Sequence, residues 1–309
     1  MPLNLSTTVR RLKSRATSLA FVFSAVALSQ LVTAGAPVKG LHVERFLPSG
    51  GGPAAVGVAL ATGPGGELYA LYDAPPRLVV WKTDSDETFE TGDVSGWVSA
   101  PTDLVSDGGM QLLVTDSRRK YILRLNHRLQ PMPPVMPEVD GERFEPLSIC
   151  RITDGTLFVI NRADDDVWRI NRDGRAVPLG WSPARSGKIR KPTRLDYSVS
   201  VDRLIILDED GVKLSAPHGD PGPPVKTVVA RPVGAGVNGD EAWIVGDGLC
   251  CVSLDGKPLF SVPVDSLESW GVYPAVDVAP QGDRRLYLLP ETGGRVLVLR
   301  VERAIAGRP

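Results

Sequence analysis

Short apolar runs recur along the chain, and each of them ends at a polar or turn-forming residue. Six of these runs can be stacked on one another: ELYALYD to Asp73, QLLVTD to Asp116, TLFVIN to Asn161, RLIILD to Asp208, EAWIVG to Gly246 and RLYLLP to Pro290. The steps between their last residues are 43, 45, 47, 38 and 44 residues. A nearly constant period of this length indicates a repeat architecture.

Each copy has the same internal order of apolar runs. A first run often begins at a proline, namely Pro101, Pro146, Pro192 or Pro274, whereas VGVAL fills that slot in the first copy and VGAGV fills it less well in the fifth. The stacked run comes second, and a third run and a weaker fourth run follow after turns. The runs are short, rich in β-branched and aromatic residues and bounded by Gly, Pro, Asp or Asn, which predicts strands joined by hairpins. No long segment has the period of an amphipathic helix.

The repeated unit is therefore predicted to be a four-stranded antiparallel meander, present six times. Sheets of this kind bury both faces when they pack face to face in a ring, so the predicted fold is an all-β, six-bladed β-propeller. The sixth copy ends at RVLVLRVERA without a clear fourth run. We expect LHVERFLP, residues 41–48, to complete that blade and close the ring. Residues 37–309 then form a single propeller domain.

Two units resemble NHL-type propeller repeats: PTDLVSDGGMQLLVTDSRRKYILRL and TLFVINRADDDVWRINRDG. The resemblance lies in a proline, an apolar run, a turn, a second run that ends in Asp or Asn, and a third strand after a polar turn. It covers roughly residues 41–302. It implies a propeller that serves as a ligand-binding or protein-binding module, while a minority of such propellers are enzymes. Fold alone does not decide between these functions.

The first 36 residues have the order of an export signal. Basic residues in VRRLKSR precede the apolar segment 16–32 and the small residues of TAGAP. This order predicts a signal peptide over residues 1–36, with an uncleaved membrane anchor as the alternative. The sequence thus predicts an exported protein of the periplasm or the extracellular space, with membrane contact only through a retained signal.

The charge balance argues against a nucleic-acid partner. The full chain has a formal net charge of −1, and residues 1–36 hold four basic residues and no acidic ones. The remaining chain is therefore mildly acidic, which does not suit a polyanionic ligand.

Three cysteines remain in the predicted domain: Cys150, Cys250 and Cys251. Their spacing matches no zinc-binding pattern. The sequence favours burial as small apolar strand residues, and a bond from Cys150 to either of the other two is the alternative.

Acidic residues at the strand ends have two interpretations. Asp73, Asp116, Asn161 and Asp208 end successive second runs, so they could form a ring of ligands or begin hairpin turns. Their recurrence in copy after copy favours turns, because Asp and Asn bond local backbone N–H groups. The run Asp164–Asp166 is likewise predicted to be a solvated turn rather than a calcium site.

The starts of the first runs are better candidates for a site, because first strands line the channel of a propeller. The candidate binding residues there are Thr102, Asp103, Thr193, Arg194 and Asp277. Asp103 and Arg194 could contact a small polar ligand across the channel mouth, or they could pair with each other.

The alternative function is that of six-bladed propellers of the gluconolactonase type, from whose ligand pattern this chain departs because it has no Glu or Asn at the equivalent strand starts. Such propellers hold a divalent metal in the channel with Glu, Asn and Asp ligands and use carboxylates as general bases. This chain offers Asp103 and Asp277, whereas Asn238 falls late in a poorly matching copy. Calcium is therefore the cofactor that this alternative implies, and the metal ligands stay unassigned.

No catalytic residue is assigned from the sequence. The only histidines are His42, His127 and His218, and they are far apart in sequence. No nucleophile elbow, phosphate loop or haem-attachment motif is present.

Three tryptophans in connecting segments, Trp97, Trp181 and Trp270, could anchor a partner or pack between blades. The long links 134–146 and 180–192 are expected on a functional face.

The main prediction is an exported, non-enzymatic binding or scaffold module for a protein or a small molecule. A calcium-dependent lactonase-type hydrolase and an accessory subunit of a cell-envelope complex are the alternatives.

Overall fold

A computed structural model describes residues 36–47, 55–82, 88–107, 111–126 and 128–304. Residues 33–309 form one compact unit. Except for Ala36, the predicted signal peptide lies outside the described residues, and so does His127. Among the described residues, no helix combines the length and the apolar character needed to cross a membrane.

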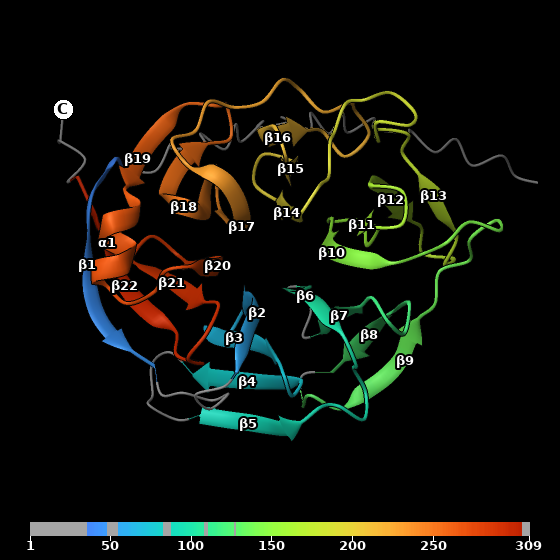
Figure 1. Ribbon diagram of the computed structural model, residues 1–309, viewed down its shortest axis with the longest axis horizontal. Coiled ribbons are helices and arrows are strands. Elements are labelled where there is room, and N and C mark those ends of the chain that lie inside the picture. The colour runs from blue at the N-terminus through green and yellow to red at the C-terminus, as the bar shows by residue number, and fades with distance from the viewer. Residues whose placement is uncertain (1–35, 48–54, 83–87, 108–110, 127, 305–309) are drawn as a thin grey trace, which may run out of the picture. The chain divides into compact units, whose positions relative to one another are not determined.

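Six small antiparallel sheets form a ring, with the first strand of each sheet at the centre (Figure 1). Blades 1 to 3 are regular meanders. Blade 1 contains β2 (Val56–Thr62), β3 (Glu67–Asp73), β4 (Arg77–Lys82) and β5 (Thr88–Asp93). Blade 2 contains β6 (Pro101–Ser106), β7 (Leu112–Asp116), β8 (Tyr121–Leu125) and β9 (Pro131–Val135). Blade 3 contains β10 (Pro146–Arg151), β11 (Leu157–Asn161), β12 (Asp166–Ile170) and β13 (Ala176–Pro178).

Blades 4 and 5 depart from the regular pattern. Blade 4 contains β14 (Arg194–Ser198), β15 (Arg203–Asp208) and β16 (Gly211–Ser215). Its predicted fourth run, VKTVV, is reduced to one bridge between Val212 and Val225. Blade 5 contains β17 (Ala230–Asn238), β18 (Glu241–Ser253) and β19 (Pro258–Val262). The first half of β18 pairs with β17 and the second half pairs with β19, so β18 supplies two strands of the meander.

The sixth blade is closed by the N-terminal strand, as predicted. It contains β20 (Ala275–Gln281), β21 (Arg285–Pro290), β22 (Leu297–Arg303) and β1 (Val38–Phe46), and it follows the short helix α1 (Val264–Ser269). β1 is antiparallel to β22, with Leu41 opposite Val301 and Phe46 opposite Leu297. The prediction of a six-bladed β-propeller of four-stranded blades is confirmed, with blade 4 as the least regular member.

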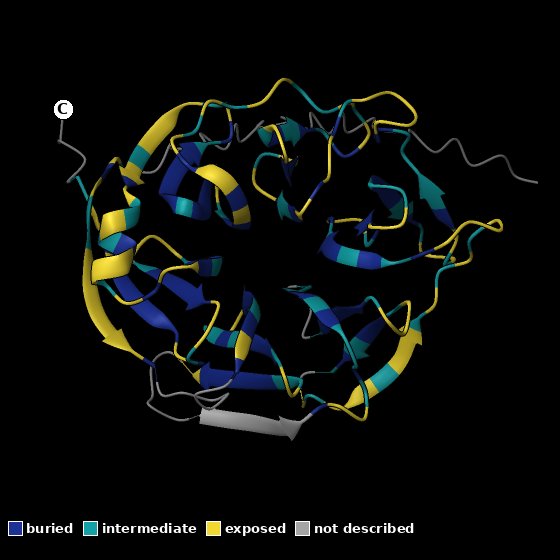
Figure 2. Ribbon diagram, viewed as in Figure 1, coloured by how far each residue is buried: buried dark blue, intermediate teal, exposed yellow. Residues whose placement is uncertain are grey.

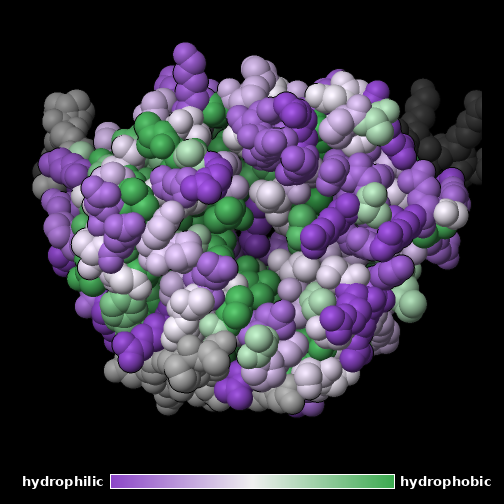
Figure 3. Space-filling view, in the orientation of Figure 1, coloured by the Kyte–Doolittle hydropathy of each residue, from purple (hydrophilic) through white to green (hydrophobic). Residues whose placement is uncertain are grey.

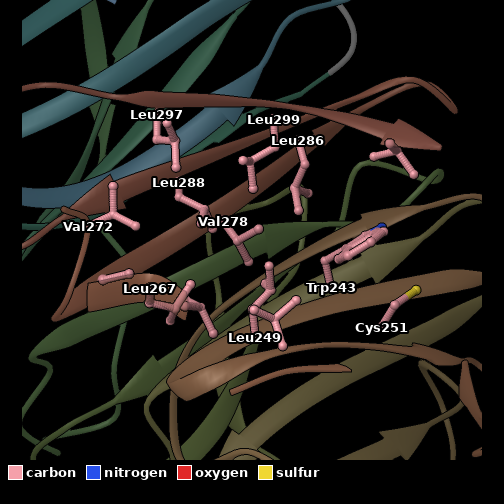
Figure 4. Close-up of a cluster of buried hydrophobic side chains, with 14 of the residues drawn as sticks. Trp243, Leu249, Cys251, Leu267, Val272, Val278, Leu286, Leu288, Leu297 and Leu299 are labelled. Carbon is pink, nitrogen blue, oxygen red and sulfur yellow. The ribbon is translucent and has the colours of Figure 1, made fainter. Parts of the chain in front are cut away.

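The hydrophobic core lies between neighbouring blades rather than at one centre. Six apolar clusters fill the interfaces between successive blades. Figure 4 shows the cluster between blades 5 and 6, where Trp243 and Leu249 face Leu286 and Leu297. Full burial of one such leucine contributes about 1.5–3 kcal/mol. Exposed residues gather on the outermost strands β1, β9 and β19 (Figure 2).

Glycines let the fifth blade approach its neighbour closely. A Cβ added to Gly234 would lie 2.6 Å from the Val276 carbonyl oxygen, and one added to Gly236 would lie 2.5 Å from the Val278 carbonyl oxygen. Side chains at these two positions would therefore force β17 away from β20. This explains why VGAGV matches the other first runs poorly.

Candidate functional site

Four buried polar residues of the first strands lie around the centre of the ring and form a connected network. They are Asp103 of β6, Ser148 of β10, Arg194 of β14 and Asp277 of β20, and all four are buried. Blades 2, 3, 4 and 6 each contribute one of them. Proline near the start of each of these strands fixes φ and needs no hydrogen-bond partner for its nitrogen, which suits the entry of the chain into the ring.

Arg194 joins alternate blades across the channel. Its Nη1 lies 2.6 Å from Asp103 Oδ1 in blade 2, and its Nη2 donates to Asp277 Oδ2 in blade 6 at 2.5 Å. The side chain of Arg194 is 8% exposed, and those of the two aspartates are 1% and 0% exposed. Asp103 and Arg194 thus pair with each other, and Asp277 is the third member of the network.

Protein donors also occupy the remaining acceptor positions of Asp103. Its Oδ2 accepts from the Ser148 hydroxyl at 2.6 Å and from the Ile149 N–H of the next blade at 2.9 Å. Its Oδ1 accepts from its own neighbour, the Leu104 N–H, at 2.7 Å. Both oxygens of this carboxylate therefore hold blade 2 to blades 3 and 4.

Asp277 repeats the arrangement between blades 6 and 1. Its Oδ2 accepts from the Leu60 N–H at 2.6 Å, and its Oδ1 accepts from the Val278 N–H at 2.9 Å. In blade 3 the Ser148 hydroxyl oxygen also binds the backbone of the next blade, because it accepts from the Leu195 N–H of blade 4 at 2.9 Å. Side chains at the starts of the first strands thus bind the backbone of the next blade, which is a folding device that recurs around the ring.

These contacts do not fit the calcium site that the lactonase alternative implies. Calcium requires six to eight oxygen ligands that converge on one point. Here a guanidinium group takes the cation position between Asp103 and Asp277, and backbone and hydroxyl donors take the other oxygens. Across the described ranges of the chain, no three His, Cys, Asp or Glu side chains form a group that could hold a metal ion.

A cavity of about 130 Å³ lies along the channel beside this ion network. Residues of the first strands of all six blades line it, and its polar wall includes Asp103, Arg194 and Asp196. Thr62 and Ser106 lie toward its other end, where β2 and β6 finish. Figure 3 shows a hollow at the middle of the ring, with hydrophobic residues around a hydrophilic floor.

Asp196 is the acidic residue of this wall that the sequence prediction missed. It is partly exposed, and its Oδ1 accepts from the Tyr197 N–H at 2.7 Å. It lies two residues after Arg194 on β14, so the alternation of a strand places both side chains on one face. The spacing of Arg194 and Asp196 in PTRLD was the sequence signal that could have predicted this position.

Burial is the main influence on the pKa of the three carboxyl groups in the channel network. Burial raises the pKa of Asp277 to about 7 and that of Asp196 to about 6, although Arg194 opposes both shifts. Burial also raises the pKa of Asp103. Burial lowers the pKa of Arg194, but the charges of Asp103 and Asp277 more than offset this, so the guanidinium stays protonated. The network therefore binds protons more readily than three exposed aspartates would.

The two threonine candidates lie at the edge of this network. The Thr102 Oγ1 hydrogen-bonds the Thr115 hydroxyl at 2.8 Å and donates to the Pro146 carbonyl oxygen at 3.1 Å. Thr193 is exposed, and its hydroxyl lies 3.4 Å from the Leu207 carbonyl oxygen that it donates to. Neither residue lines the central cavity.

The recurring acidic residues bind local backbone, as the turn interpretation predicts, and some also bind the preceding loop. Asp116 accepts from the Arg118 and Arg119 N–H groups within its turn and from the Ser99 N–H. Asn161 accepts from the Glu145 N–H at 2.7 Å, and Asp208 from the Arg190 N–H at 3.0 Å. These residues hold each blade to the link that leads into it.

The prediction of a solvated turn at residues 164–166 holds for Asp164 and Asp165, which lie partly exposed in a turn, and is wrong for Asp166. Asp166 is fully buried and accepts from the Gly180 and Trp181 N–H groups at 3.0 and 2.9 Å. Asp164 accepts from the Trp168 indole N–H at 3.0 Å. Asp166 instead begins β12 and binds the backbone of the link 180–192.

The loop tryptophans pack against the blades. Trp181 is 4% exposed, and Trp97 and Trp270 are partly buried against neighbouring apolar clusters. All three cysteines are buried and free, which confirms the apolar interpretation. The links 134–146 and 180–192 are joined by Arg185 and Glu142, whose atoms approach to 3.2 Å.

Comparison with solved structures finds several six-bladed propellers of similar shape. A gluconolactonase from Xanthomonas campestris has a TM-score of 0.65 and 15% identity, covering 86% of this chain and 97% of its own. A virginiamycin B lyase from Staphylococcus aureus has a TM-score of 0.59 and 14% identity, covering 85% and 100%. A PQQ-bound aldose sugar dehydrogenase from Streptomyces coelicolor has a TM-score of 0.63 and 18% identity, covering 86% and 100%. At these identities the similarity shows the fold and not the activity.

No protein-family model matches the sequence, and no curated protein matches it either. The structural neighbours include gluconolactonase and virginiamycin B lyase propellers.

Proposed function

We propose that the protein is an exported recognition module that binds a small polar molecule in the central channel, against Arg194 and Asp196 and without a metal ion. The observation that carries this proposal is the cavity of about 130 Å³ that residues of all six first strands line. It combines an apolar wall with one guanidinium and one partly exposed carboxylate, which is the usual composition of a small-molecule site.

The size of the cavity limits the ligand. Pockets for drug-sized molecules occupy about 300–1,000 Å³, so this cavity takes a small molecule or a single group of a larger one. Asp196 lines the cavity with a carboxylate that already accepts from the Tyr197 N–H, and the ion network fixes Arg194 beside it. The names of the three structural neighbours describe proteins that act on or bind small organic molecules. This favours a small-molecule ligand over a large protein partner.

A thermal-shift series tests this proposal with a panel of aldoses, aldonic acids and aldonolactones as probes. A ligand of the channel should raise the Tm of the wild type in a saturable manner, because binding to the native state alone stabilises it. Asp196→Asn should remove the shift, whereas Asp265→Asn, an exposed aspartate of α1, should leave it unchanged. A shift of the same size in Asp196→Asn would place the ligand elsewhere.

The lactonase-type hydrolase is the second candidate, since two of the structural neighbours are described as gluconolactonases. Asp196 has a pKa of about 6, which is close to the operating pH that suits a general base. In this chain such a reaction would run without calcium, because Asp103 and Asp277 bind Arg194. Lactone hydrolysis that resists EDTA and is lost in Asp196→Asn would support this candidate, and activity restored by calcium after chelation would contradict it.

The resemblance to NHL-type repeats belongs to the same proposal. It describes the Pro-first strand and the Asp-terminated second strand, which hold successive blades together here.

Export is supported by the order of basic, apolar and small segments over residues 1–36. Comparing the N-terminus of the secreted protein with that of the cell-associated protein would test it.

A further inference from the structure

A second pocket lies between blades 2 and 3, away from the channel network. It has a volume of about 240 Å³, and its polar wall consists of Gln111, Arg124, Arg151, Asn171 and Arg172. The arginines come from three separate places: Arg124 from β8, Arg151 from the last position of β10, and Arg172 from the turn after β12. Three guanidinium groups that face one pocket form an unusual concentration of positive charge in an acidic protein.

Acidic side chains only partly balance this charge. Arg151 pairs with Asp107, whose side chain is 1% exposed. Within the described part of the chain, neither Arg124 nor Arg172 has a carboxylate oxygen within 4.0 Å. Arg124 donates to the Gln111 Oε1 at 3.1 Å, and Arg172 donates to the Asp154 carbonyl oxygen. The Asp154 carboxylate accepts from the Thr156 N–H at 2.8 Å and is nearly fully exposed.

Two of the guanidinium groups converge over Gly155. A Cβ on this glycine would lie 3.2 Å from Arg172 Nε and 3.4 Å from Arg151 Nη2. Gly155 has φ = 89°, a conformation that side chains rarely adopt, and its bare Cα leaves room for both groups. Two like charges at one point repel each other, so an anion between them would be bound strongly.

The amide side chains add neutral donors to the same pocket. Gln111 uses its oxygen to accept from Arg124, which turns its Nε2 toward other acceptors. The Asn171 side chain forms no hydrogen bond to the described residues. Guanidinium and amide N–H groups together match an oxyanion, which offers only acceptors.

We propose that this pocket between blades 2 and 3 is a binding site for a small oxyanion, namely a phosphate or carboxylate group of a metabolite, held by Arg124, Arg151 and Arg172. The proposal is independent of the channel ligand, since no residue lines both cavities. Arg151 already pairs with Asp107, and Arg172 is attracted by the exposed Asp154 carboxylate, so Arg124 contributes most of the unbalanced charge.

Titration calorimetry and thermal shift with inorganic phosphate test the proposal, at constant ionic strength set with chloride. Acetate and citrate form a second arm, which separates phosphate from carboxylate recognition. The wild type should show saturable binding of one anion class. Arg124→Gln and Arg172→Gln should each weaken it about tenfold, because each loses one charge-assisted contact.

Arg203→Gln is the matched control, since Arg203 is an exposed arginine at the start of β15 and does not line the pocket. It should bind the anion as tightly as the wild type. Gly155→Ala gives a second measurement: the added methyl group should block the anion while leaving all three charges in place. Its folding is checked by the circular dichroism of the variant. Equal anion effects in all variants, or no saturable effect in the wild type, would overturn the proposal.

Discussion

Replacing Arg194 by methionine probes the ion network at the centre of the ring. The variant keeps most of the side-chain volume but removes the cation that contacts Asp103 and Asp277 at 2.6 and 2.5 Å. A buried carboxylate without a partner protonates rather than remain charged. The cost of the substitution is therefore limited by the free energy of protonating the carboxyl group at the working pH.

This limit sets the expected magnitude. At pH 7, protonating a carboxyl group with an ordinary pKa near 3.9 costs about 4 kcal/mol, since each pH unit corresponds to about 1.4 kcal/mol. Asp277, with a pKa of about 7, is already half protonated there, so Asp103 accounts for most of the loss. We expect the free energy of unfolding to fall by up to about 4 kcal/mol at pH 7, which is the size of effect that breaking other buried ion pairs has. At pH 5 the same limit falls to about 1.5 kcal/mol.

Urea unfolding of the wild type and of Arg194→Met at both pH values measures this difference. The double variant Asp103→Asn with Arg194→Met serves as the control, because it removes the carboxylate that the single variant leaves without a cation. It should recover part of the stability at pH 7, and its loss of stability relative to the wild type should differ less between pH 7 and pH 5 than that of the single variant. A loss below about 1 kcal/mol at pH 7, or the same loss at pH 5, would refute the idea that Arg194 compensates buried charge.

Three further predictions concern other parts of the molecule. Between about pH 4 and pH 6, Asp196 holds more protons in the folded than in the unfolded state, so its contribution to the free energy of unfolding falls as the pH rises. Asp196→Asn should reduce the slope of the unfolding free energy against pH in this range by up to about 1.4 kcal/mol per pH unit. Urea unfolding at several pH values measures the slope, and an unchanged slope in the variant would contradict the prediction. Chelation with EDTA should leave the Tm unchanged, because Arg194 holds the channel carboxylates; a drop that calcium reverses would indicate a structural metal. Burial raises the pKa of the Cys150, Cys250 and Cys251 thiols, so they should react with a thiol reagent only after unfolding. Rapid labelling of the native protein would contradict that arrangement.

The fold was predictable from the sequence because each blade repeats one pattern. The period near 45 residues, the hairpin turns and the missing strand of the last copy together predicted six blades and their closure by β1. The exception in blade 4 has a local cause. VKTVV follows Pro221, Pro223 and Pro224, which have no N–H group to donate to a neighbouring strand, and only Val225 pairs.

The central network was predictable only in part. The position of Asp103, Arg194 and Asp277 at the starts of first strands placed them around one channel. Their pairing across alternate blades, and the donors that fill every acceptor of Asp103, depend on distances that no sequence pattern records. The pocket between blades 2 and 3 was missed because its arginines belong to different turns and strands of two copies.

The pairing of β1 with β22 also has a consequence for biosynthesis. Among the described strands, the one that completes blade 6 leaves the ribosome before all the others, and its partner β22 leaves after all the others. At about 5–20 residues per second, β1 waits on the order of tens of seconds for its partner. Its composition suits this delay, because Lys39, Glu44 and Arg45 keep the waiting strand hydrated. Blade 6 can therefore be completed only after β22 has been made, and a chain that lacks β22 would keep an unsealed ring.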